Sequence, residues 1–180
     1  MSGDKATLRL KMREMAETRR NVRPLSSQLV GQLLHWPTWQ SSGVIAAFSA
    51  LAGEPDPLDP WPHGKRIALP RVCGDELAFH LADCKAGLLA GRFGIPEPPA
   101  EAPDAGKQFD LILVPGLAFD LRGGRLGRGK GFYDRFLATA RGIRAGVCFE
   151  DQIVTGIPVE EHDLRMDFVI TPAAIYRCGS

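Results

Sequence analysis

The stretch "DLILVPGLAFDLRGGRLGRGKGFYDRFL", Asp110–Leu137, decides the fold of this chain. It begins with a continuous apolar string, which is typical of a strand that is buried on both faces of a sheet. A loop rich in glycine and arginine follows, and a helical pattern begins near Gly131. Strand, loop and helix in this order predict an α/β fold, with the loop at the carboxyl end of a strand, where ligands bind in parallel sheets.

The N-terminal part of the chain predicts an amphipathic helix from Lys5 to about Arg20. Apolar Leu8, Met12 and Met15 recur there at helical spacing, opposite a face of lysine and arginine. Lys5 and Arg9 share that cationic face because residues four apart are neighbours on a helix.

The remaining patterns alternate between helix and strand. Ser26 and Ser27 are expected to cap a second helix that runs to Leu34. Strands are expected at residues 43–49, 66–72, 76–82, 109–115, 143–150 and 167–171, with a long surface connection over 91–106. This order predicts an α/β fold, a single domain over residues 1–180 with a mainly parallel sheet and helices on both faces.

Composition limits the classes of function. The chain has 180 residues, 44% of them apolar and 24% charged, and a formal net charge of +1, so no strong overall field attracts nucleic acid or membrane. The four cysteines are widely spaced, without a C-x-x-C pair, which favours reduced thiols over a zinc site or a disulfide framework. No signal-like or membrane-spanning apolar run occurs, so we expect a cytoplasmic protein with no membrane partner.

The glycine loop is predicted to bind phosphate. Gly127, Gly129 and Gly131 alternate with Arg128 and Lys130, so the backbone can approach a ligand closely while two cations remain. Backbone N–H groups in such a loop, next to a helix N-terminus, form an anion site. Glycines that merely form turns beside solvated arginines are the alternative.

Two standard phosphate-binding motifs each match this loop except at one residue. Gly124, Gly129 and Lys130 match G-x-x-x-x-G-K, but Gly131 stands where a Walker loop has the serine or threonine that ligates magnesium. G-x-G-x-x-G fails because Phe132 replaces its third glycine. The loop therefore predicts neither a Walker site nor a dinucleotide site.

The residues after the loop allow two readings each. Asp134 lies at the helix start, where a carboxylate either caps the helix or holds a magnesium ion bound to phosphate. Phe132 and Tyr133 either stack on a flat ligand or pack inward.

The order of these segments resembles the 5-formyltetrahydrofolate cyclo-ligase family, whose members are also called 5,10-methenyltetrahydrofolate synthetases. "VPGLAFD" followed by "GGRLGRGKGFYDRFL" is similar to the signature of that family. Weaker pieces fall in the expected order along nearly the whole chain: "KATLR", "FSALAGE", "LPRV", "GIPEP" and "IPVEEHDLRMDFVIT".

The resemblance implies an ATP-dependent ligase of one-carbon metabolism that uses Mg²⁺. It would cyclise 5-formyltetrahydrofolate to 5,10-methenyltetrahydrofolate with release of ADP and phosphate, through an N5-iminium phosphate. No protein nucleophile is needed, because positioning and charge neutralisation carry phosphoryl transfer.

The resemblance also implies roles for individual residues. The expected catalytic residues are Arg128, Lys130 and Tyr133. The expected nucleotide-binding residues are Lys5, Arg9, Arg125, Leu126, Gly127, Arg128, Gly129, Lys130, Gly131, Phe132 and Tyr133. The expected folate-binding residues are Ser49, Glu54, Arg128, Gly129, Lys130, Gly131 and Phe132, and the expected magnesium ligands are Asp134 and Asp163.

The chain departs from the family pattern at two places. Phe132 stands where the family usually has a tyrosine, so a hydroxyl is missing there while stacking is retained. Pro55 and Pro57 stiffen the segment after Glu54, where the family usually has a small apolar residue and a threonine.

Two other functions remain open at this point. A sugar-phosphate isomerase or deaminase on a similar fold would use the loop for a monophosphate without ATP. A phosphate-binding module that binds RNA would use the basic loop and its aromatics, but the net charge of +1 is against it. We expect small-molecule substrates, no nucleic-acid partner and a monomer.

Overall fold

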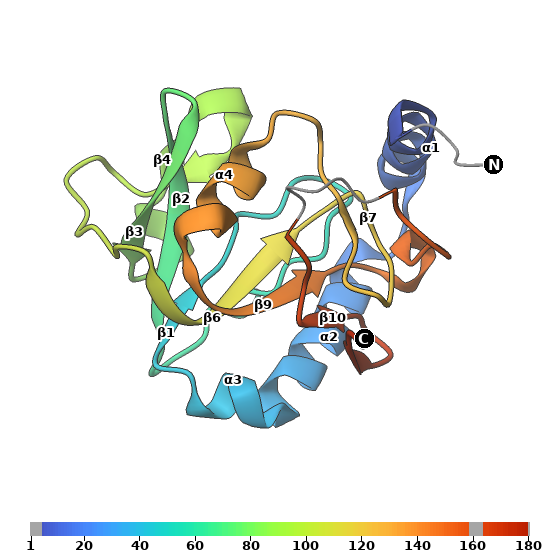
Figure 1. Ribbon diagram of the computed structural model, residues 1–180. Coiled ribbons are helices and arrows are strands. Elements are labelled where there is room, and N and C mark those ends of the chain that lie inside the picture. Colours follow the sequence, from blue (N-terminus) through green and yellow to red (C-terminus); the bar gives the residue numbers. More distant parts are fainter. Residues whose placement is uncertain (1–4, 159–163, 180) are drawn as a thin grey trace.

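A seven-stranded sheet forms the centre of the computed structural model, which describes residues 5–158 and 164–179 (Figure 1). Its strand order is β11-β10-β9-β6-β1-β2-β3. The five central strands, from β10 to β2, run parallel, and β11 and β3 pair antiparallel at the two edges. The mainly parallel sheet predicted from the sequence is confirmed.

The bounds of the elements follow the chain in this order. The helices are α1 (Lys5–Thr18), α2 (Val22–His35), α3 (Pro37–Ser41) and α4 (Phe132–Thr139). The sheet strands are β1 (Val44–Ala46), β2 (Arg66–Cys73), β3 (Glu76–Ala82), β6 (Gln108–Pro115), β9 (Arg141–Val147), β10 (Phe168–Ile170) and β11 (Ile175–Arg177). Two small hairpins are formed by β4 (Leu89–Ala90) with β5 (Pro96–Glu97), and by β7 (Ala118–Phe119) with β8 (Arg125–Leu126).

Helices cover both faces of the sheet, as the sequence predicts. In β6, Leu111 and Leu113 pack with the buried residues of α2 and α3, whereas Ile112 and Val114 pack with Phe136 and its neighbours in α4. All four β6 side chains are fully buried. Because successive side chains of a strand point to opposite faces, a continuous apolar run is what a strand between two helical layers requires.

Helix α1 lies beside the β7–β8 hairpin, outside the two main layers. Met12 is buried against Leu117, Leu126 and Ile157, with Leu8 and Met15 packed on the same cluster, so the predicted apolar face of the helix is confirmed. Figure 1 shows the loop that leads into α4 crossing the top of the sheet between α4 and α1.

The second helix begins earlier than predicted. It starts at Val22, after Asn21 in a left-handed conformation, and Ser26 lies inside the helix. The Ser26 hydroxyl is buried and accepts a hydrogen bond from Asp56 N at 3.1 Å. The serine that resembled a cap therefore joins the helix to the segment after Glu54.

Candidate active site

A cavity of about 570 Å³ opens at the carboxyl ends of β1, β2 and β6. The chain passes from β1 to β2 on one side and later returns to β6 on the other side of β1, so the strand order switches there. Crevices at such switch points are the usual ligand sites of open parallel sheets. The volume lies within the range of small-molecule sites, which is roughly 300–1,000 Å³.

The buried carboxylate of Asp120 fixes the start of the glycine loop. Its Oδ1 accepts hydrogen bonds from Arg122 N at 3.0 Å and Gly124 N at 2.9 Å, and its Oδ2 accepts one from Ile157 N at 2.8 Å. Further along, Gly129 (φ 100°) and Gly131 (φ 69°) are in backbone conformations that side chains rarely adopt. The backbone conformation therefore favours glycine at positions 129 and 131.

Arg125 and Asp134 form an ion pair across the start of α4. Arg125 Nη2 donates to Asp134 Oδ1, and the Arg125 side chain is only 6% exposed. Arg125 Nη1 also lies 3.4 Å from the Pro115 carbonyl oxygen, at the end of β6. Asp134 therefore neutralises a buried cation as well as lying at the helix start.

Arg128 is paired with Glu54 across the cavity. Arg128 Nη2 donates to Glu54 Oε1 at 2.7 Å, while Glu54 Oε2 accepts from Leu51 N at 3.0 Å. Glu54 is buried. Arg19 of the segment after α1 donates to the Gly53 carbonyl at 2.6 Å and so holds this turn in place.

Helix α1 supplies cations that reach the same loop. Arg9 Nε donates to the Gly127 carbonyl at 3.1 Å, and Arg13 Nη2 donates to the Arg128 carbonyl at 2.9 Å. Lys5, Arg9 and Arg13 all line the cavity. Their spacing of four residues explains why one helix face can follow the whole loop.

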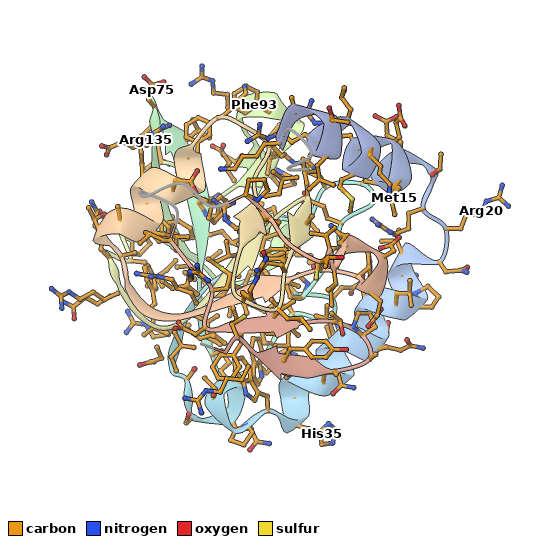
Figure 2. All side chains as sticks on the ribbon, turned by 45° about the vertical axis from the view of Figure 1, so that its right-hand side comes forward. Met15, Arg20, His35, Asp75, Phe93 and Arg135 are labelled. Atoms are coloured by element: carbon orange, nitrogen blue, oxygen red, sulfur yellow. The ribbon has the colours of Figure 1, made fainter. Side chains whose placement is uncertain are left out.

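Aromatic rings flank Lys130 at the cavity mouth. The Lys130 Nζ lies 3.5 Å from the centroid of the Phe93 ring, and the Phe93 and Phe132 rings lie 6.5 Å apart. Phe93 is half exposed and has a positive φ of 63°. Figure 2 shows Phe93 at the same end of the molecule as α1, near Arg135 and Asp75 and opposite His35.

Tyr133 lines the cavity and carries a buried hydroxyl. The oxygen has no hydrogen-bond partner among the described residues, although Tyr133 lines the cavity. Burial raises the pKa of the Tyr133 hydroxyl far above its usual value, the charge of Glu54 adds to this rise, and Arg125 opposes it. The phenol stays protonated at neutral pH and is a hydrogen-bond donor.

The structure brings the residues singled out from the sequence to this one cavity. Its lining contains every one of them that is described: Lys5, Arg9, Ser49, Glu54, Arg125, Leu126, Gly127, Arg128, Gly129, Lys130, Gly131, Phe132, Tyr133 and Asp134. Asp163 lies outside the described residues. Within the described ranges, no three His, Cys, Asp or Glu side chains gather as a metal site.

The cavity lining also contains residues that the sequence did not predict. Arg13 continues the Lys5–Arg9 spacing, a signal that could have found it. Phe93 and Glu97 belong to the stretch interpreted as a surface connection; Glu97 lies in the "GIPEP" piece of the family resemblance, but that piece carried no assignment to the site. Their place in the cavity depends on the β4–β5 arm folding back over β2, which is a tertiary contact.

A family model matches nearly the whole chain. Residues 1–172 match the model described as the 5-formyltetrahydrofolate cyclo-ligase family. The chain belongs to the 5-formyltetrahydrofolate cyclo-ligase family. The resemblance noted in the sequence is thereby confirmed over nearly the whole chain.

Curated members of the cyclo-ligase family agree with this. The 5-formyltetrahydrofolate cyclo-ligase of Escherichia coli is 30% identical over 179 residues, which cover 93% of this chain and 98% of that protein. The enzyme of the same name from Mycolicibacterium smegmatis is 42% identical over 121 residues, which cover 61% of each chain. These relatives give no support to the isomerase, deaminase or RNA-binding readings.

Solved structures confirm the fold of the family. The NMR structure of Aquifex aeolicus 5,10-methenyltetrahydrofolate synthetase superposes with a TM-score of 0.88 at 32% identity, covering 98% of this chain and 93% of that one. A 5,10-methenyltetrahydrofolate synthetase from Mycoplasma pneumoniae shares the fold, with a TM-score of 0.71 at 20% identity over 94% and 99% of the two chains.

Proposed function

We propose that this chain catalyses the ATP-dependent cyclisation of 5-formyltetrahydrofolate to 5,10-methenyltetrahydrofolate, with release of ADP and phosphate. The observation that carries the proposal is the cavity in which the cations of α1 and of the glycine loop face the Glu54 turn. Family membership supplies the reaction, and the cavity supplies a place for both substrates.

The reaction needs no covalent bond to the protein. The formyl oxygen attacks the γ-phosphorus of ATP, so that an O–P bond forms and the P–O bond to ADP breaks. N10 then adds to the activated formyl carbon and releases its proton to solvent, and the carbon–oxygen bond to phosphate breaks to leave the methenyl bridge. The protein contributes orientation and charge neutralisation, which are the main sources of catalysis in phosphoryl transfer.

The cations are assigned to the nucleotide. Lys5 and Arg9 would bind its phosphates from α1, and residues 125–133 would surround them from the loop. Arg128 and Lys130 are placed at the transferring phosphate, since both are exposed in the loop and line the cavity. Tyr133 completes the catalytic group because its unpaired phenol can donate to an oxygen that gains charge.

The folate is assigned to the opposite wall. Glu54 and Ser49 lie on the segment after β1, and Phe132 offers a ring face in place of the tyrosine that the family usually has. Ser49 Oγ already donates to the Pro96 carbonyl at 2.7 Å, so toward a ligand its oxygen is an acceptor.

Asp134 is the described residue that fits a magnesium ion bound to ATP. It lines the cavity, and the hydrogen bond from Arg125 uses only its Oδ1. Magnesium in nucleotide sites takes one or two carboxylates together with substrate phosphates and water, so one cavity-facing carboxylate is sufficient. The ion would neutralise phosphate charge, and Asp163 is proposed as its second ligand.

We further propose a cytoplasmic, monomeric enzyme that consists of one catalytic unit, residues 1–180, and acts on small molecules. All four cysteines are free thiols, which supports a reducing compartment. The described helices are at most 14 residues long, shorter than the roughly 20 residues that cross a bilayer, and none has the apolar character of a span.

The reaction is tested by mixing the purified protein with 5-formyltetrahydrofolate and MgATP and following the near-ultraviolet absorption of the methenyl product. We expect product only when ATP is present, together with one ADP for each product molecule. A folded protein that binds ATP but forms no product would refute the proposed reaction.

A further inference from the structure

Glu97 is a buried carboxylate in the cavity wall that has almost no partner. The residue is 5% exposed, and its one hydrogen bond from a described residue is a long one from Val72 N, at 3.4 Å. An ionised carboxylate has about four acceptor sites, and buried carboxylates are normally paired. A carboxylate left open toward a cavity therefore points to a ligand that donates hydrogen bonds.

The other acidic side chains of the described lining are already paired with cations. Glu54 is bonded to Arg128 and to Leu51 N, and Asp134 is bonded to Arg125. Of the three acidic residues that line the described cavity, Glu97 alone has no cationic partner.

The backbone around Glu97 is held firmly on both sides. Ser49 Oγ donates to the Pro96 carbonyl at 2.7 Å, and Arg71 Nη1 donates to the Pro98 carbonyl at 2.5 Å. The two prolines fix their own φ angles. The β2 edge beyond Ala68 has no β1 partner, so the Glu97 arm can cover it.

The side chain of Glu97 is fixed as well. It lies against Gly91, where an added Cβ would be 2.3 Å from Glu97 Cγ and Cδ. A side chain at position 91 would have to displace the carboxylate. Pairing of Leu89 with Glu97 and of Ala90 with Pro96 holds Gly91 in this position.

The cavity has two chemically different sides. Its cations come from α1 and from the loop between Arg125 and Lys130, whereas the wall built by β2, β3 and the β4–β5 arm is apolar apart from Glu97. The apolar part of that wall is formed by Pro70, Val72, Leu77, Phe93 and Ile95. The first side suits a phosphate chain, and the second suits a flat heterocycle with hydrogen-bond donors on one edge.

We propose that Glu97 binds the pyrimidine edge of the folate, accepting hydrogen bonds from its 2-amino group and N3–H. These two donors are parallel and adjacent, so they match the two oxygens of one carboxylate, as the two N–H groups of an arginine fork do. The proposal rests on the proposed function and assigns Glu97 as a residue that selects the folate ring.

The test compares two substrates in wild-type and Glu97→Gln protein: 5-formyltetrahydrofolate and its 2-desamino-2-methyl analogue. With 5-formyltetrahydrofolate, we expect kcat/KM of Glu97→Gln to fall at least tenfold, while KM for ATP is unchanged. With the analogue, which lacks the amino donor, we expect the substitution to change kcat/KM less than threefold. Glu101→Gln, a substitution of an exposed residue in the same connection, is the matched control and is expected to behave as wild type.

Gly91→Ala provides a second variant that keeps the carboxylate but displaces it. We expect it to reproduce the selective loss with 5-formyltetrahydrofolate. Equal losses on both substrates, or no loss with Glu97→Gln, would overturn the assignment of Glu97. If wild-type protein forms no product, the proposed reaction is refuted, but the assignment of Glu97 is still testable. Calorimetric titration with 5-formyltetrahydrofolate then compares the affinities of wild type and Glu97→Gln, and equal affinities would overturn the assignment.

Discussion

Tyr133 carries a hydroxyl that is buried without a partner among the described residues, and this contributes nothing to stability. An unsatisfied buried donor costs free energy, on the order of 1–3 kcal/mol, unless a ligand uses it. The ring itself packs in the α4 cluster, edge-on to Phe136. The ring and the hydroxyl of Tyr133 thus serve different purposes.

Tyr133→Phe is therefore expected to leave the free energy of unfolding unchanged or slightly raised, and to lower kcat about tenfold or more. Urea unfolding and steady-state kinetics measure the two effects separately. Tyr176→Phe on the edge strand β11 is the control and is expected to retain full activity. A marked loss of stability with unchanged kcat would assign the hydroxyl a structural role.

Lys130 is exposed in the loop, and its one described ring contact is with Phe93. Lys130→Ala is expected to reduce kcat/KM about 100-fold to 1,000-fold, because the variant loses the cation that is proposed to bind the transferring phosphate. The melting temperature should not change. Lys107→Ala, an exposed lysine outside the cavity lining, is the control. Near-normal turnover of Lys130→Ala would remove this lysine from the mechanism.

Under the proposed function, helix α1 connects the stability of the fold to nucleotide binding. Its apolar face packs on the β7–β8 hairpin, and its cationic face bonds to the carbonyls of the glycine loop. If the helix shifts, both Arg9 and Arg13 lose the loop. A core residue of α1 should therefore influence nucleotide affinity without touching the nucleotide.

Met12→Ala is expected to cost about 2–4 kcal/mol of unfolding free energy, since Met12 is 3% exposed, and to raise KM for ATP several-fold. Leu10→Ala on the exposed side of the helix, where Leu10 is 62% exposed, should change stability by less than about 0.5 kcal/mol. Urea titrations and ATP saturation curves compare the two. An unchanged KM for ATP in Met12→Ala would separate helix packing from nucleotide binding.

The start of β6 is joined to β1 by a titratable group. Asp110 Oδ2 accepts hydrogen bonds from Val44 N and Gly43 N, both at 2.8 Å. These bonds, the first from Val44, hold the pKa of Asp110 below its ordinary value of 3.8. The folded pKa is the lower one, so the charged carboxylate stabilises the fold above the ordinary value, and this stabilisation is lost as pH falls through the folded pKa.

Asp110→Asn should therefore flatten the acid side of the stability curve between about pH 5 and pH 2. At pH 7 the cost is expected to be on the order of 1 kcal/mol, because the group is largely exposed. Urea unfolding at several pH values gives the comparison, with Asp83→Asn as an exposed control. An unchanged pH profile would show that the two hydrogen bonds add no stability.

The four cysteines of the molecule differ in their exposure to solvent. Cys148 is fully buried, and burial raises the pKa of its thiol far above the usual value; burial also raises the pKa of Cys178, to about 11. Cys73 and Cys84 are exposed. A thiol reagent at pH 8 should modify Cys73 and Cys84 rapidly, Cys178 slowly, and Cys148 only on global unfolding. Mass spectrometry of the modified sites would contradict this if Cys148 reacted with the fast group.

The sequence predicted what depends on local pattern. Apolar runs predicted β2, β3 and β6 to within a residue or two, because burial on both faces of a sheet requires apolar side chains. The glycine loop indicated the site, because positive φ angles favour glycine. The start of α2 was placed wrongly, since Ser26 has a tertiary partner in Asp56 N.

Elements that depend on distant contacts left no such trace. The short α3 and β11 were not predicted, and the β4–β5 arm was interpreted as a surface connection. Glu97 lies in that arm between two prolines, which locally indicate a loop. Glu97 is buried because the β4–β5 arm covers the part of β2 that has no β1 partner. The sequence alone could not place Glu97 in the cavity.

The cations of the cavity already have partners within the protein. Arg128 is paired with Glu54, and Arg125 is paired with Asp134. Arg9 and Arg13 donate hydrogen bonds to carbonyls of the glycine loop, and Lys130 lies over the Phe93 ring. An arriving anion consequently exchanges contacts with these partners and gains only the difference in free energy. Under the proposed function, the same partners within the protein would bind the cations again when the charge on the ligand decreases. Release of the spent nucleotide would then be favoured over its retention.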